Sequence, residues 1–169
     1  HMRQSRRPFV QSGVGAALAS CDNCLAVSGR IGQCFEKVSE VERRHGCSIT
    51  MRGGGTSQAG QSIGSGIQID TSKFYNRILE VNAEERWARI EPGVVLDELN
   101  THLQPLGLRF APDISTASRA TVGGMVANNS SGARSVLYGK TIDHVLEFTV
   151  ALSDGSVVHF REIPRREIP

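Results

Sequence analysis

The chain has 169 residues, of which 39% are hydrophobic, enough for one domain with a core or for two small lobes that share a cleft. Its net charge of +2 and its 5% content of aromatic residues argue against a nucleic-acid-binding module, which needs a basic surface and stacking side chains. No stretch approaches the roughly 20 continuous apolar residues of a membrane span, so we expect a cytoplasmic domain.

Two motifs near the N-terminus are set aside. Residues 3–21 resemble a lipoprotein signal, but polar residues and glycines interrupt its apolar part. Residues 13–18 resemble the start of a dinucleotide fingerprint, but no convincing strand precedes them. We therefore interpret residues 1–23 as a tag remnant, His1 and Met2, followed by an N-terminal extension.

The four cysteines do not predict a metal site. Cys21 and Cys24 form a Cys-x-x-Cys pair, and Cys34 and Cys47 follow, but this spacing matches no standard zinc or iron–sulfur pattern. Cys34 lies within a helical pattern, where a free buried thiol is the ordinary explanation. We expect no bound metal.

From residue 25 onward the pattern predicts a strand, a helix and a second strand. Residues 25–27 are a short apolar run, residues 31–41 carry apolar side chains at helical spacing, and residues 47–51 lead as a strand into a glycine loop. Open α/β sheets bind ligands at the carboxyl ends of such strands. The glycine loop therefore lies where a ligand site is expected.

The glycine loop consists of Arg52, Gly53, Gly54, Gly55, Thr56 and Ser57. Three consecutive glycines put no side chain between the backbone and a ligand, and they can turn successive N–H groups toward one anion. Thr56 and Ser57 add hydroxyl donors, and Arg52 adds a positive charge. The loop is a candidate phosphate cradle, with a flexible surface turn as the alternative.

The next segments complete a predicted first lobe, residues 24–110. Residues 67–69 alternate as a strand, residues 78–90 have the pattern of a hairpin, and residues 95–103 have the spacing of an amphipathic helix.

A polar loop rich in hydroxyl donors, residues 111–121, then precedes a predicted helix over residues 122–128. Thr121 can cap this helix. Gly123 and Gly124 in its first turn would let a ligand approach the helix N-terminus closely. We interpret this N-terminus as a second anion site, with turn chemistry alone as the alternative.

The remaining residues complete a partial second lobe, residues 111–160, and a tail, residues 161–169. Residues 128–132 offer amide and hydroxyl partners for a ribose or a polar heterocycle. Residues 145–152 and 157–160 have the pattern of a hairpin. Two anion-binding loops without the lysine and serine of a Walker motif favour a ligand with two linked phosphates, a dinucleotide.

Three long motifs carry a family resemblance: RGGGTSQAGQ at residues 52–61, PGVVLDELN at residues 92–100, and PDISTASRATVGGMVANNSSGARSVLYGKTIDHVLE at residues 112–147. They resemble the FAD-binding domain of the vanillyl-alcohol oxidase and p-cresol methylhydroxylase superfamily. Within it, the chain is most similar to FAD-linked dehydrogenases of D-2-hydroxy acids, related to the glycolate oxidase FAD subunit. The resemblance implies an α+β, two-lobed FAD-binding domain whose second lobe is incomplete here.

The resemblance also implies which residues hold FAD. The glycine loop would cradle the pyrophosphate, the following polar loop and helix start would hold the adenosine and diphosphate side, and residues 128–131 would lie along the ribityl and flavin portion. In covalently flavinylated relatives a histidine follows the glycines, where this chain has Thr56, so we expect non-covalent FAD. The implied cofactor-binding residues are Arg52, Gly53, Gly54, Gly55, Thr56, Ser57, Asp113, Ser115, Thr116, Ser118, Thr121, Gly123, Gly124, Asn128, Asn129, Ser130 and Ser131.

In such enzymes the flavin accepts a hydride from the α-carbon of a 2-hydroxy acid, and the groups that bind this acid lie mostly in a substrate domain that this chain lacks. We therefore assign no catalytic residue, and the histidines show no motif spacing. The expected function is that of an FAD-binding fragment of a D-2-hydroxy-acid dehydrogenase, inactive alone. The alternative is a non-catalytic flavin-fold remnant that binds a partner or associates with itself as a homo-oligomer.

Overall fold

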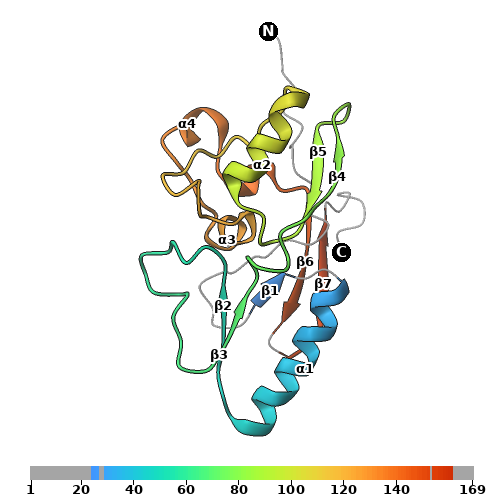
Figure 1. The fold of residues 1–169 in the computed structure, drawn as a ribbon, viewed down its shortest axis with the longest axis vertical. Coiled ribbons are helices and arrows are strands. Elements are labelled where there is room, and N and C mark those ends of the chain that lie inside the picture. The colour runs from blue at the N-terminus through green and yellow to red at the C-terminus, as the bar shows by residue number, and fades with distance from the viewer. Residues whose placement is uncertain (1–23, 27–28, 153, 162–169) are drawn as a thin grey trace, which may run out of the picture.

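The computed structural model describes residues 24–26, 29–152 and 154–161, which form a mixed arrangement of helices and strands (Figure 1). The predicted N-terminal extension and most of the predicted tail lie outside these residues. The elements in chain order are β1 (Cys24–Ala26), α1 (Gly29–His45), β2 (Ile49–Arg52), β3 (Ile67–Asp70), β4 (Ile78–Asn82), β5 (Trp87–Ile90), α2 (Leu96–Leu103), the 3-10 turn η1 (Gln104–Leu106), α3 (Val122–Asn128), α4 (Ser135–Tyr138), the 3-10 turn η2 (Thr141–His144), β6 (Glu147–Leu152) and β7 (Val157–Arg161).

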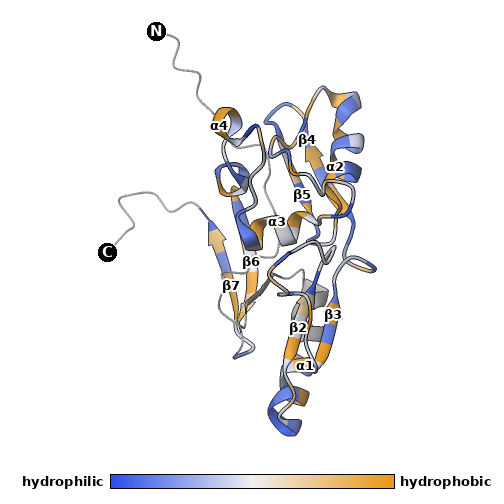
Figure 2. Ribbon diagram, turned by 90° about the vertical axis from the view of Figure 1, so that its left-hand side faces the viewer, coloured by the Kyte–Doolittle hydropathy of each residue, from blue (hydrophilic) through white to orange (hydrophobic). Residues whose placement is uncertain are grey.

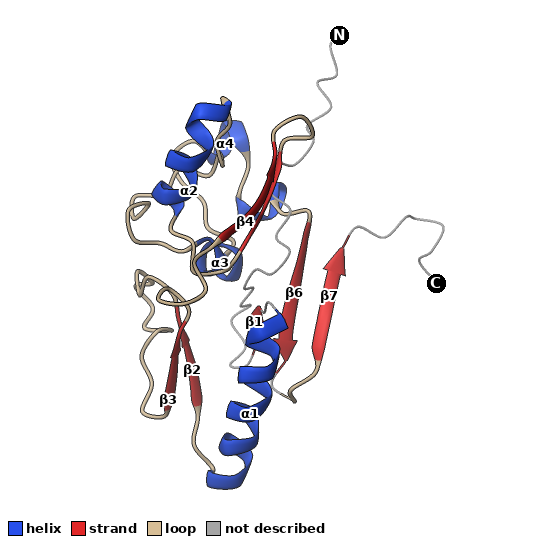
Figure 3. Cartoon of the chain, turned by 45° about the vertical axis from the view of Figure 1, so that its right-hand side comes forward, coloured by secondary structure: helices blue, strands red, loops and turns tan. Residues whose placement is uncertain are grey.

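The strands form three small sheets, seen as separate groups of red arrows in Figure 3. Strands β2 and β3 pair in parallel, and β4 and β5 form an antiparallel hairpin. In the third sheet β6 lies between β1 and β7 and is antiparallel to both. The expected α+β class is confirmed, as are the strand, helix and strand order up to β2 and both hairpins.

The main apolar core is built from β5, α2 and α3. Leu96, Leu99 and Leu103 recur at helical spacing on one face of α2, and each is at most 1% exposed. Phe110 and Met125 complete this core from the following loop and from α3. The packed core therefore continues past residue 110, where we place the boundary between the two lobes, and that boundary stays a prediction.

A buried carboxylate fixes the chain between β5 and α2. Glu91 is 1% exposed. Its two carboxylate oxygens accept hydrogen bonds from the Arg77 N–H at 2.9 Å, from Arg77 Nη2 at 2.7 Å and from Arg77 Nε at 3.1 Å. The two side-chain bonds, together with the negative charge of Glu91, hold the pKa of Arg77 above its ordinary value. The pair joins the start of β4 to the turn that leads into α2.

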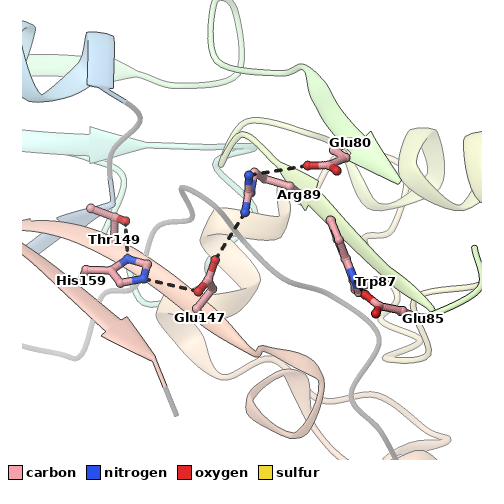
Figure 4. A network of polar contacts seen from close by, with 7 residues as sticks. All are labelled: Glu80, Glu85, Trp87, Arg89, Glu147, Thr149 and His159. Atoms are coloured by element: carbon pink, nitrogen blue, oxygen red, sulfur yellow. Dashed lines mark hydrogen bonds and ion pairs between the residues drawn. The ribbon is translucent and has the colours of Figure 1, made fainter. Parts of the chain in front are cut away.

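A polar network joins the β4–β5 hairpin to the β6–β7 hairpin (Figure 4). Arg89 on β5 lies 3.5 Å from a Glu80 carboxylate oxygen and 3.8 Å from one of Glu147 on β6. Nε2 of His159 lies 3.4 Å from the other Glu147 oxygen, and its Nδ1 is hydrogen-bonded to the Thr149 hydroxyl at 2.9 Å. Because these groups are partly solvated, we expect the network to orient the hairpins more than to stabilise them.

The turn between β6 and β7 contains a carboxylate that should make the stability of the fold depend on pH. The Ser156 hydroxyl and the Ser156 N–H both donate to Asp154 Oδ1, at 2.6 and 2.8 Å, and these bonds hold the pKa of Asp154 below its ordinary value. A depressed folded-state pKa stabilises the fold at pH values above about 4, and this contribution is lost as the pH falls through the lowered pKa.

Asp154→Ala should therefore lower the melting temperature at pH 7, and the difference from the parent chain should shrink as the pH falls below about 4. Thermal unfolding followed by circular dichroism at several pH values measures this. A difference that stays constant across that range would contradict the assignment.

Candidate functional site

The glycine loop begins where the parallel pair β2–β3 ends. The Thr71 N–H and hydroxyl both donate to the Arg52 carbonyl, at 2.9 and 3.2 Å, and this is the last step of the ladder. Beyond Arg52 the backbone turns away as residues 53–57. The structure thus places the loop at the carboxyl end of β2, as expected from the sequence. The parallel partner of β2 is β3, however, whereas the first strand of the expected unit, β1, pairs with β6 in another sheet.

The backbone donors of this loop are available. Within the part of the chain that the structure describes, no hydrogen bond uses the N–H groups of Gly53, Gly54, Gly55 or Thr56. Three of these four residues, all but Gly55, are half-buried. Since partly buried N–H groups are normally paired, four successive unpaired donors fit an anionic ligand.

Two side chains add to the polarity of the loop. The Arg52 guanidinium lies against Gly55, where an added Cβ would be 3.2 Å from Nη2. The Ser57 hydroxyl donates to the side chain of Gln61. The positive charge of Arg52 therefore lies beside the free donors.

The loop rests directly on the polar segment that precedes α3. A Cβ on Gly53 would lie 2.3 Å from Thr121 Oγ1, and a Cβ on Gly54 would lie 2.0 Å from the Arg119 carbonyl oxygen. No side chain fits at either position without a shift of its neighbours. Close packing between the two predicted loops is thus one reason for glycine here, besides access for a ligand.

The N-terminus of α3 differs from the expectation. Thr121 caps the helix as predicted, since its hydroxyl accepts from the Gly124 N–H at 3.3 Å. The Val122 N–H, however, donates to the Val94 carbonyl at 2.8 Å, and the Gly123 N–H donates to the Pro92 carbonyl at 2.9 Å. The donors proposed for a second anion are already paired. The expectation of an open helix N-terminus is corrected, and contact of Gly123 and Gly124 with FAD remains a prediction.

In the polar loop of residues 111–121, some side chains make contacts within the fold and others are exposed. The Asp113 carboxylate lies 3.3 Å from Arg134 Nε and 3.6 Å from Arg109 Nη2. Ser115 and Ser118 are exposed. The side chains of Ser115 and Ser118 are thus open to solvent, whereas Asp113 is a partner of two arginines.

The segment after α3 is fixed by η2. Asn129 ends the helix in the left-handed conformation, with φ of 45°, and its side-chain oxygen accepts from the Ile142 N–H at 3.0 Å. The Ser130 carbonyl accepts from the Thr141 N–H at 3.1 Å and from its hydroxyl at 2.8 Å. Asn128 and Ser131 remain exposed.

The structure brings some of the predicted residues together, since Gly53 and Gly54 lie against the segment that includes Thr121. The glycine loop contacts residues 119–121, and Gly132 packs on Asp113, where an added Cβ would be 1.6 Å from the carbonyl oxygen. Sequence reasoning missed Pro92 and Val94 as the partners of α3, because backbone carbonyls far along the chain leave no sequence signal. Among the described residues, no group of three histidine, cysteine, aspartate or glutamate side chains could hold a metal, and no helix is long and apolar enough to cross a membrane.

Comparison with known proteins gives consistent matches. The sequence profile of a family described as "FAD binding domain" matches residues 35–161. A D-2-hydroxyglutarate dehydrogenase of Pantoea ananatis (strain AJ13355) is 50% identical over 116 residues, which are 69% of this chain and 11% of that protein. Glycolate oxidase subunit GlcD of Bacillus subtilis (strain 168) is 33% identical over 125 residues, 73% of this chain and 27% of that subunit. The chain therefore spans only a small part of the relatives it matches.

A solved structure of alkyldihydroxyacetonephosphate synthase has the same fold. It superposes with a TM-score of 0.65 at 24% identity, and the match covers 76% of this chain and 26% of that chain.

Proposed function

This chain belongs to the FAD-binding domain family, and on that premise we propose that residues 53–57 hold the pyrophosphate of a non-covalent FAD within an oxidoreductase that acts on a D-2-hydroxy acid. The single observation that supports this site is the set of four successive free N–H groups beside Arg52. Two linked phosphates carry the negative charge that such donors stabilise.

The other residues predicted to contact FAD differ in how exposed their side chains are. Ser115, Ser118, Asn128 and Ser131 are exposed and can hydrogen-bond the adenosine, ribityl or ring portions of FAD. Asp113, Thr116, Ser130, Gly123 and Gly124 stay proposed contacts. The Asn129 side-chain oxygen is committed to η2, so any contact would come from its amide NH₂ group.

The similarity to a D-2-hydroxyglutarate dehydrogenase and to a glycolate oxidase subunit supports the proposed reaction of the whole protein. When bound, FAD supplies the acceptor for a hydride from the substrate carbon. The residues described here would bind and orient that cofactor, and we assign them no proton transfer. His144 Nε2 is hydrogen-bonded to the Tyr138 carbonyl at 2.8 Å and His159 is engaged with Glu147, so neither is placed as a base. A cytoplasmic location and self-association stay predictions.

The visible absorption spectrum of the purified chain, after incubation with excess FAD and desalting, tests the proposal. Retained flavin absorbance is expected. Loss of all flavin from a sample that unfolds cooperatively would overturn the proposal and would favour the flavin-fold remnant.

Arg52→Gln should weaken FAD binding about tenfold, because it removes the positive charge beside the pyrophosphate cradle. The difference should shrink at high salt, since an exposed charge is screened. Titration of FAD fluorescence at two ionic strengths measures both effects. Arg44→Gln is the matched control, because Arg44 pairs with Glu40 on α1. Equal affinities for the two variants would contradict a role for Arg52.

A further inference from the structure

One buried hydroxyl contacts both the glycine loop and α3. Thr121 is 2% exposed, and its Oγ1 accepts from the Gly124 N–H. The same oxygen lies so close to Gly53 that a Cβ there would be 2.3 Å away. Thr121 therefore joins the loop that carries the free N–H groups to the helix that follows the polar segment.

The backbone around Thr121 is held from the other side. The Leu96 N–H donates to the Ala120 carbonyl at 3.0 Å, and the Val122 N–H donates to the Val94 carbonyl at 2.8 Å. Val95 and Thr121 form an isolated antiparallel bridge. This pairing ties Thr121 to the start of α2 and to the apolar core, so its hydroxyl is a fixed support for the loop.

From this geometry we infer that Thr121 is a positioning residue, which seats Gly53 and so sets the direction of the free N–H groups of residues 53–56, without contacting FAD itself. The inference rests on the proposed function. It assigns to Thr121 a different role from the direct contact expected from sequence. It also makes Gly53 and Thr121 an energetically coupled pair, because either change alone disturbs the same contact.

A double-mutant cycle tests the pair. Gly53→Ala should weaken FAD binding at least about thirtyfold, because its new Cβ meets Thr121 Oγ1. Thr121→Ala removes this oxygen. The remaining Thr121 Cβ is 3.4 Å from the Cβ that an alanine would add at position 53, which is an ordinary contact. The double variant should therefore bind FAD within about threefold of Thr121→Ala alone.

Gly54→Ala is the matched control. Its Cβ would lie 2.0 Å from the Arg119 carbonyl, a backbone atom that no side-chain change removes. Adding Thr121→Ala to Gly54→Ala should therefore not restore the affinity for FAD. Thr121→Ser, which keeps the hydroxyl, should bind FAD within about threefold of the parent chain, whereas Thr121→Val should lose at least about tenfold.

Dissociation constants are measured by flavin fluorescence at a temperature where circular dichroism shows every variant folded, and the same variants are melted without FAD. A double variant that binds FAD more than about threefold more weakly than Thr121→Ala, or a Thr121→Ser variant as weak as Thr121→Val, would overturn the inference. If the parent chain binds no FAD, the proposed function fails. In that case, melting temperatures that show the same coupling between Gly53 and Thr121 would leave Thr121 only a packing role. That result would overturn the positioning role independently of the proposed function.

Discussion

Gly132→Ala is expected to lower the free energy of unfolding by at least about 3 kcal/mol. An added Cβ would lie 1.6 Å from the Asp113 carbonyl oxygen and 2.4 Å from its carbonyl carbon. These are backbone atoms, so the clash can be relieved only if the polar loop and the segment after α3 move apart. Urea unfolding of the parent chain and the variant measures the difference.

Gly60→Ala is the control for this substitution. Gly60 has a φ of +79°, which an alanine adopts only with strain, but nothing lies within 4 Å of its built Cβ. Its cost should be about 1 kcal/mol. Because Gly132 does not have a positive φ, the larger loss of unfolding free energy in Gly132→Ala would come from the contact with Asp113 alone. Equal losses for the two variants would refute the close approach of Gly132 to Asp113.

Glu91→Ala should lower the free energy of unfolding by about 2–4 kcal/mol. The substitution removes the acceptor of three hydrogen bonds from Arg77 and leaves a cavity where the side chain was 1% exposed. Glu91→Gln, which keeps the volume but not the charge, should lose less. Chemical unfolding monitored by Trp87 fluorescence and by circular dichroism measures both losses.

Glu80→Ala is the matched control for Glu91→Ala, because Glu80 also faces an arginine. Its side chain is 54% exposed and its nearest contact with Arg89 is 3.5 Å, so removal should change stability by no more than about 1 kcal/mol. A loss for Glu91→Ala as small as that for Glu80→Ala would show that the Glu91–Arg77 pair adds little to the fold.

Local signals explain why much of the fold could be predicted from the sequence. Thr121 followed by apolar residues at helical spacing predicted α3 and its cap, and polar turn residues predicted the β4–β5 and β6–β7 hairpins. The position of the glycine loop after β2 followed from the same local reasoning. Each of these features depends on residues close together in the chain.

The features that were missed depend on distant backbone contacts or on very short elements. Pairing of Pro92 and Val94 with the start of α3 uses carbonyl oxygens, which every residue has, so it leaves no sequence signal. Helix α4, which lies at the edge of the molecule (Figure 2), has only four residues. Its Val136 and Leu137 are exposed, so no buried apolar periodicity marks the helix in the sequence.

From the sequence alone, the glycines of residues 53–54 indicate close access of a ligand to the backbone. Their close contact with residues 119–121 follows only from the fold, which brings two segments that are distant in the sequence side by side. The free N–H groups agree with access for a ligand. The short distances from an added Cβ to Thr121 and Arg119 show that close packing also requires glycine here. One glycine can thus satisfy two requirements, and sequence reasoning identified only the local one.

The pairing of β1 with β6 has a consequence for how the domain forms during synthesis. Cys24 lies opposite Leu152, and Ala26 lies opposite Val150, so the first described strand finds its partner almost at the opposite end of the chain. A ribosome releases β1 long before β6 exists, and such distant pairing is slow because a long loop must close first. Until then the middle strand of the three-stranded sheet is missing. We expect this sheet to close only after translation has passed residue 152, so that β1 stays without its strand partner until then.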